Sequence, residues 1–74
     1  SKPQTVKIIS DGQTDIEIHK VGKFNPARQL ELDLRPGEYT IIGSRLMYRD
    51  VRYTLNIEVG EQTESLEVIC RDKL

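Results

Sequence analysis

Few residues of the chain have side chains suited to catalysis. His19 is the only histidine, and Glu17 lies two positions before it, on what we predict to be the same face of a strand. Such a pair can exchange a proton, but no serine or cysteine is placed beside it to be activated. A metal ion would need three or four ligands, and His19 with Glu17 and Glu31 is thin evidence for such a site. We therefore predict that His19 is exposed on a solvated sheet face, with no catalytic residues, metal site or cofactor.

The remaining nucleophiles also lack partners. Ser44 lies near Arg45 and Asp50 in the sequence, but no histidine or lysine is placed to act as its base. Cys70 is the single cysteine, so it cannot form an internal disulfide. The glycines stand singly, which excludes a glycine-rich phosphate loop. The sequence predicts that the chain is not an enzyme.

Three arginines and a tyrosine fall within residues 45–52, and they are the residues best suited to binding a partner. They are Arg45, Tyr48, Arg49 and Arg52. A guanidinium group binds carboxylates and stacks on aromatic rings, and both properties are common at protein interfaces. In the alternative interpretation, Asp50 and the acids of the sheet faces neutralise these arginines and no partner site exists.

The composition limits the possible classes of function. The 74 residues suffice for one small domain, spanning residues 1–74, and 36% are hydrophobic and 31% charged. A net charge of −1 and few aromatic residues argue against nucleic-acid binding. No apolar run approaches the roughly 20 residues that a membrane span needs, so we predict a soluble domain. The chain begins with serine, and we expect a piece of a longer protein.

Apolar and polar residues alternate in short segments separated by turn-forming residues. This pattern predicts strands over residues 6–9, 15–21, 30–34, 39–43, 51–59 and 66–70, with a turn over 60–64. The segment 22–26 interrupts the second strand, since Pro26 cannot donate to a ladder. Only residues 46–48 could form a helical turn. The expected fold is all-β, a small antiparallel β-sandwich of six to seven strands.

The alternation also predicts the core. Its members are Val6, Ile8, Ile16, Ile18, Leu30, Leu32, Leu34, Tyr39, Ile41, Val51, Tyr53, Leu55, Ile57, Leu66, Val68 and Cys70. Val21, Ile42 and Ile69 fall outside this register, and we expect them to be exposed, where a neighbouring domain could dock.

The segment 35–38 is a turn signal between two of the predicted strands. Pro36 fixes φ at the second position, and Gly37 permits the positive φ that a type II turn requires at the third. So short a link predicts an antiparallel hairpin of residues 30–34 with 39–43.

Several of these segments resemble the PEGA domain family. They are Val21-Gly22-Lys23, Asn25-Pro26, the stretch from Leu32 to Ile41 around Pro36-Gly37-Glu38-Tyr39, then Tyr48, and Leu55 to Gly60. The resemblance covers about residues 16–60. The chain departs from the family near residues 10–16, where no Pro-Glu-Gly-Ala occurs, and at Met47, where a glycine is expected.

The resemblance implies a small bacterial β-sandwich module with no known catalytic residues, often in envelope proteins. We therefore expect a non-enzymatic spacer or protein-interaction module within a larger bacterial protein, with other domains of that protein as its partners. The cell envelope or periplasm is favoured, and the cytoplasm stays open. Free sheet edges would also allow a weak homodimer. The alternative function is a carbohydrate- or peptidoglycan-binding module, which would use Tyr48 and Phe24 as stacking surfaces.

Overall fold

The computed structural model describes residues 2–60 and 64–74 of the chain, and these residues form seven strands and no helix. The strands are β1 (Gln4–Ile9), β2 (Asp15–Ile18), β3 (Gly22–Phe24), β4 (Gln29–Leu34), β5 (Gly37–Ser44), β6 (Val51–Ile57) and β7 (Glu64–Glu67). The all-β fold that the sequence predicts is confirmed.

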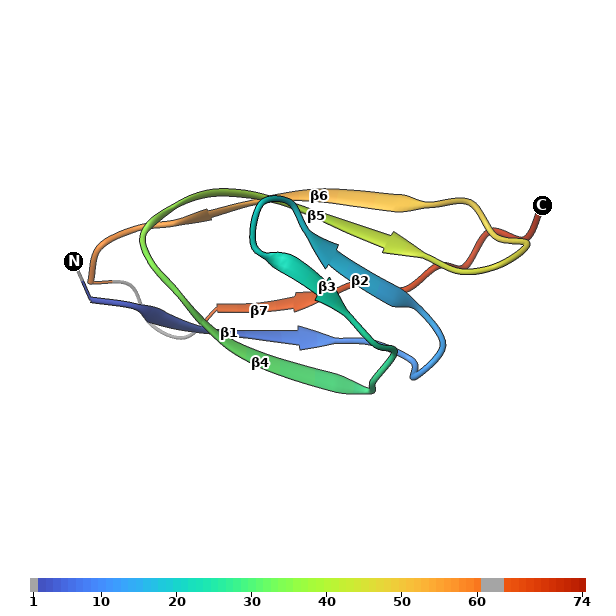
Figure 1. Ribbon diagram of the computed structural model, residues 1–74, viewed down its shortest axis with the longest axis horizontal. Coiled ribbons are helices and arrows are strands. Elements are labelled where there is room, and N and C mark those ends of the chain that lie inside the picture. Colours follow the sequence, from blue (N-terminus) through green and yellow to red (C-terminus); the bar gives the residue numbers. More distant parts are fainter. Residues whose placement is uncertain (1, 61–63) are drawn as a thin grey trace.

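The strands form two sheets that pack face to face (Figure 1). One sheet has the order β4-β1-β7 and the other the order β3-β2-β5-β6. β1 and β7 are parallel, with Val6 opposite Glu64, whereas the other described pairs are antiparallel. The predicted small β-sandwich is confirmed, but this one pair is parallel where the sequence predicts antiparallel strands. Because β6 belongs to the other sheet, the chain crosses over before β7, as a parallel neighbour requires.

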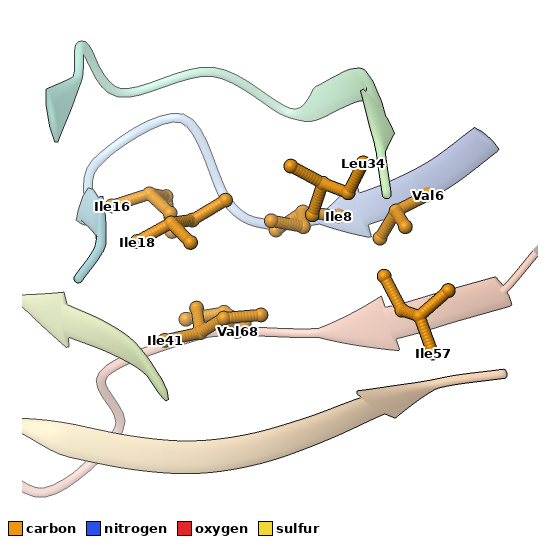
Figure 2. Packing of buried hydrophobic residues seen from close by; sticks show 8 residues of the cluster. All are labelled: Val6, Ile8, Ile16, Ile18, Leu34, Ile41, Ile57 and Val68. Carbon is orange, nitrogen blue, oxygen red and sulfur yellow. The ribbon is translucent and has the colours of Figure 1, made fainter. Parts of the chain in front are cut away.

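The core fills the space between the two sheets (Figure 2). Val6 and Ile8 of β1 point into it from one sheet, and Ile18 and Ile41 point into it from the other, all fully buried. Each buried aliphatic side chain contributes about 1.5–3 kcal/mol of transfer free energy. All residues of the predicted core are buried or packed against it, so this prediction is confirmed. Phe24 joins them.

The predicted hairpin of residues 30–34 with 39–43 is wrong. β4 pairs with β1, whereas β5 pairs with β2 and β6 in the opposite sheet. Pro36 and Gly37 form an arch that carries the chain from one sheet to the other, with Gly37 at φ 150°. The Tyr39 hydroxyl donates a hydrogen bond to the carbonyl of Arg35 across this arch (2.7 Å). Gly37 has the positive φ that the sequence predicts. The value of 150° is far from the roughly +80° of the predicted type II turn, and the residue serves a crossover between layers.

The predicted interruption at residues 22–26 is wrong in its first half. Gly22–Phe24 form β3, which pairs with Ile16–Ile18 of β2. The chain reverses through a tight turn in which Val21 N–H donates to Ile18 O (2.9 Å) and Lys20 takes φ 67°. A non-glycine residue with positive φ carries no sequence signal for a turn, which explains why the pattern does not reveal this hairpin.

Several predicted strand ends are corrected. β2 stops at Ile18, whereas the pattern predicts a strand to residue 21. β6 stops at Ile57, and Val59 is exposed. β7 stops at Glu67, although Val68 and Cys70 beyond it are buried as predicted. Gly60 lies in a turn with φ 81°, and residues 61–63 of the predicted turn 60–64 lie outside the described residues. Glu64, the last residue of that predicted turn, belongs to β7. The molecule is elongated, about 41 × 19 × 17 Å.

Candidate interaction surface

One end of the molecule is formed by the β5–β6 connection and the last residues of the chain. We call residues 45–49 and 72–74 the tip. Tyr48 N–H donates to Arg45 O (3.0 Å), which closes a turn with Met47 at φ 70°. The C-terminal residues run antiparallel to this turn: Arg49 N–H donates to Asp72 O, and Leu74 N–H donates to Met47 O, both at 2.8 Å. Backbone hydrogen bonds therefore hold the two segments of the tip together.

The tip exposes apolar side chains. Leu46 is 89% exposed, Met47 59% and Leu74 70%. The hydrogen bond between Leu74 and Met47 brings two of these three residues together from distant parts of the sequence. Among the described residues, the other exposed large hydrophobic side chains are Val21 and Val59, which belong to other turns. Exposed apolar residues that gather in one place are typical of surfaces that contact another molecule.

Arg45 is fixed at the edge of the tip. Its guanidinium group lies over the Tyr48 ring, 4.2 Å from the centroid. Arg45 also donates from Nη2 to Gln13 Oε1 (2.6 Å), and its Nη1 lies 3.9 Å from Asp11 Oδ2. The cation–π contact holds the Tyr48 ring in place, and one face of that ring is therefore covered. Asp11, which the sequence pattern does not indicate as a site residue, is the acid that pairs with Arg45.

The other two predicted residues are placed differently. Arg49 belongs to the tip and is exposed, with its backbone N–H bonded to the C-terminal segment. Arg52 is exposed on β6, opposite Ile42 of β5. The structure thus brings Arg45, Tyr48 and Arg49 together on the tip, whereas Arg52 belongs to the sheet. Of the predicted exposed apolar residues, Val21 is exposed, and Ile42 and Ile69 are half-buried.

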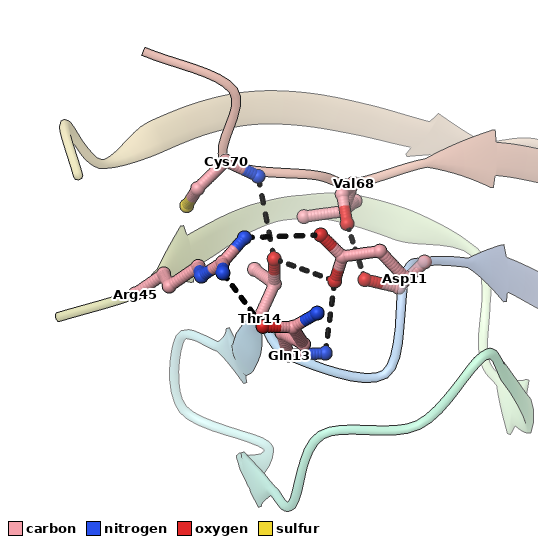
Figure 3. Close-up of polar contacts among 7 residues, drawn as sticks. Asp11, Gln13, Thr14, Arg45, Val68 and Cys70 are labelled. Carbon is pink, nitrogen blue, oxygen red and sulfur yellow. Dashed lines mark hydrogen bonds and ion pairs between the residues drawn. The ribbon is translucent and has the colours of Figure 1, made fainter. Parts of the chain in front are cut away.

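A polar network beneath the tip connects three segments (Figure 3). Asp11 Oδ1 accepts hydrogen bonds from Gln13 N–H (2.9 Å) and from the Thr14 hydroxyl (3.0 Å). The Thr14 oxygen in turn accepts a bond from Cys70 N–H (3.3 Å). Thr14 is fully buried. The sequence indicates the turn at Asp11-Gly12 but not this network, because hydrogen bonds between distant segments leave no local pattern.

The network perturbs two ionisable groups. Burial opposes ionisation of Asp11, but hydrogen bonds from Gln13 and Thr14, together with the Arg45 charge, outweigh it and lower the Asp11 pKa below its ordinary value of 3.8. Burial raises the pKa of the Cys70 thiol. Asp11 is therefore a carboxylate at neutral pH, and Cys70 is a poor nucleophile.

The residues considered for proton transfer or metal binding do not come together in a site. His19 lies in the turn after β2, exposed, with its backbone N–H bonded to Thr40 O (2.9 Å). Glu17 faces outward on β2, between Lys23 of β3 and Ile42 of β5. Within residues 2–60 and 64–74, no three histidine, cysteine, aspartate or glutamate side chains gather closely enough to hold a metal ion.

A hollow of about 380 Å³ lies beside β2, β3 and β5, and Glu17, Lys23, Phe24 and Ile42 are among the residues that line it. Phe24, one of the two rings considered for sugar binding, also packs against the core. The lining includes two acids, Asp15 and Glu17, one lysine and apolar carbon, and no histidine stands among these residues to activate the hydroxyl of Ser44.

Comparison with protein-family models finds no match for this chain, and comparison with curated proteins finds none either. The part of the chain that the structure describes contains no helix long and apolar enough to cross a membrane.

Proposed function

We propose that the chain is a non-catalytic spacer and interaction module that lies in line between other parts of a larger bacterial protein. The observation that carries this proposal is the position of the chain ends. β1 begins at one end of the long axis, and the chain finishes at the tip, at the other end (Figure 1). A domain built this way would hold any segments joined to its two ends apart by about 41 Å.

The partner in this proposal is the domain that adjoins the tip. Any segment joined to Leu74 starts beside the exposed Leu46 and Met47 side chains. A neighbour connected by a short link has a high effective concentration at this surface, so even a small apolar contact is occupied. Arg49, exposed beside the same residues, supplies a cation that suits an acidic rim on the partner.

The resemblance to the PEGA family supports the same role, because it implies modules appended to other domains. Met47 stands where that family's pattern has glycine, and the residue there takes φ 70°, a conformation that glycine adopts at low cost. The bacterial origin and an envelope location rest on this resemblance alone.

Hydrogen exchange in the full-length parent protein tests the proposal. Backbone amides of residues 45–49 should exchange more slowly in the parent protein than in the isolated 74-residue chain, because the adjoining domain covers the tip. The variants Leu46→Ser and Arg49→Glu should remove most of this difference. Both side chains are exposed, so the fold should stay intact.

Val59→Ser is the matched control, because Val59 is 75% exposed and follows the last residue of β6, whereas residues 45–49 of the tip precede its first residue. It should leave the protection at the tip unchanged. Equal exchange at residues 45–49 in the two forms of the wild-type protein would show that no neighbour contacts the tip, and the proposal would then be wrong.

A further inference from the structure

β6 is the longest strand at a sheet edge in the described part of the chain. Each sheet ends in two edge strands: β4 and β7 in one, β3 and β6 in the other. β3 has three residues and β7 has four, whereas β6 has seven. β6 follows the upper margin of the molecule in Figure 1. Its outer side presents backbone N–H and C=O groups that no strand of its own sheet pairs with.

The other long edge, β4, is protected against pairing with itself. Its outward side chains include Glu31 and Asp33, both exposed. If two copies of β4 paired antiparallel in a register centred on Glu31, the two Glu31 residues would lie opposite each other. A register centred on Leu32 would place Glu31 of each copy opposite Asp33 of the other. Like charges directly opposite each other destabilise a strand pair.

β6 has no such protection. It contains no proline, no lysine and no charged residue on its inward face. Its inward residues Tyr53 and Leu55 pack against the core but stay half-buried. An added strand would cover both residues.

We propose that two copies of this chain associate through an antiparallel pairing of their β6 edges, centred on Leu55. The inward side chains of β6 belong to odd-numbered residues. They lie on the same face of the joined sheet only in registers in which odd-numbered residues of one copy are opposite odd-numbered residues of the other. A register centred on Thr54 places Asp50 opposite Glu58, two acids. The register centred on Leu55 places Arg52 opposite Glu58 twice, Tyr53 opposite Ile57 twice, and the two Leu55 residues opposite each other.

Arg52 and Glu58 are both exposed, so they are accessible for the two ion pairs of this register. The paired β6 strands would join the two four-stranded sheets of the copies into one continuous sheet. The inference goes beyond the proposed function, because the surface is the segment Arg52–Glu58 and the partner is a second copy. The antiparallel arrangement points the two tips in opposite directions.

Sedimentation equilibrium of the intact chain tests the pairing. The wild-type chain should dimerise with a dissociation constant below about 1 mM, and added salt should weaken the dimer. Arg52→Glu or Glu58→Arg alone converts both ion pairs into like-charge pairs and should raise the dissociation constant roughly tenfold or more. The double variant Arg52→Glu/Glu58→Arg should restore dimerisation.

Glu31→Arg, the same change of charge on β4, is the control and should have no effect. Disulfide formation determines the register: Leu55→Cys should link two copies under mild oxidation, and Thr54→Cys should not. A chain that stays monomeric at about 1 mM overturns the proposal. The proposal is also wrong if the dissociation constant is unchanged by Arg52→Glu and Glu58→Arg, if Glu31→Arg changes it, or if Thr54→Cys links two copies.

Discussion

Gly43 of β5 is buried and closely surrounded by three other segments of the chain. A Cβ atom at this position would lie 2.8 Å from Val51 Cγ2, 2.8 Å from Val68 Cγ1 and 3.1 Å from Thr14 Cγ2. Val68 comes from the C-terminal segment and Thr14 from the loop before β2. Three segments therefore meet over a position that has room only for hydrogen.

Gly43→Ala should destabilise the protein. The added methyl group meets branched side chains that are packed on several sides, and such overpacking typically costs about 1–3 kcal/mol. The free energy of unfolding can be measured by urea denaturation followed by circular dichroism. Gly22→Ala on β3 is the matched control, because its Cβ would meet only the tip of the Phe24 ring at 3.8 Å. Equal stability of the two variants would contradict the packing around Gly43.

The sequence predicts the buried apolar residues well, but it does not reveal the buried polar residue Thr14. Alternation assigns Val6, Ile8 and Ile41 to an inward face because the pleat fixes the direction of each side chain. Thr14 is different: it is polar, stands next to a turn, and is buried only because Asp11 and Cys70 satisfy its hydroxyl. Such a position depends on the tertiary fold and cannot be recognised from the local pattern.

The β1–β2 loop binds the C-terminal segment to the rest of the sandwich through side-chain hydrogen bonds. Ser10 donates from its hydroxyl to Val68 O (2.7 Å), and Thr14 accepts from Cys70 N–H (3.3 Å). Asp11 orients Thr14 and pairs with Arg45 at the base of the tip. The Asp11 carboxylate therefore links the β1–β2 loop to Arg45 directly and to the C-terminal segment through Thr14.

The contribution of these contacts to the stability of the protein should depend on pH through Asp11. Its pKa is lower in the folded state than its ordinary value of 3.8, so its contribution to stability is complete above that value. The contribution is lost as the pH falls through the lower, folded-state pKa. Asp11→Asn should therefore be less stable than wild type at neutral pH, by about 1 kcal/mol, and the difference should shrink in acid.

Urea denaturation at a series of pH values from neutral to strongly acidic measures this difference. Asp15→Asn, a change at an exposed carboxylate of β2, provides the control and should show no such narrowing. A difference between wild type and Asp11→Asn that stays constant across the series would contradict the ionised role of Asp11.

The connection between β4 and β5 shows why strand pairing is harder to predict than strand position. The sequence indicates both strands and the positive φ of Gly37, but a short link between two amphipathic strands has two solutions. A hairpin places the strands side by side in one sheet, and an arch places them face to face in two. Both bury Leu34 and Ile41, so the apolar pattern cannot distinguish them; here the arch forms, with Tyr39 bonded to Arg35.

For the whole molecule, the arch determines the architecture and the elongated shape. It sends β4 to one sheet and β5 to the other, and the crossover before β7 completes the first sheet beside β1. The candidate surface results from the same topology. Residues 45–49 stand out in the sequence by their arginines and tyrosine, but residues 72–74 do not, since only the crossing of the C-terminal segment brings them to the tip.

The two-layer arrangement can be measured directly by nuclear Overhauser contacts in isotope-labelled protein. We expect cross-strand contacts between β1 and β4, for example Lys7 with Glu31, and between β5 and β6, for example Thr40 with Thr54. We expect none between the backbones of β4 and β5. A ladder of backbone contacts joining β4 directly to β5 would show a hairpin in one sheet, and the sandwich, its tip and its free β6 edge would all have to be abandoned.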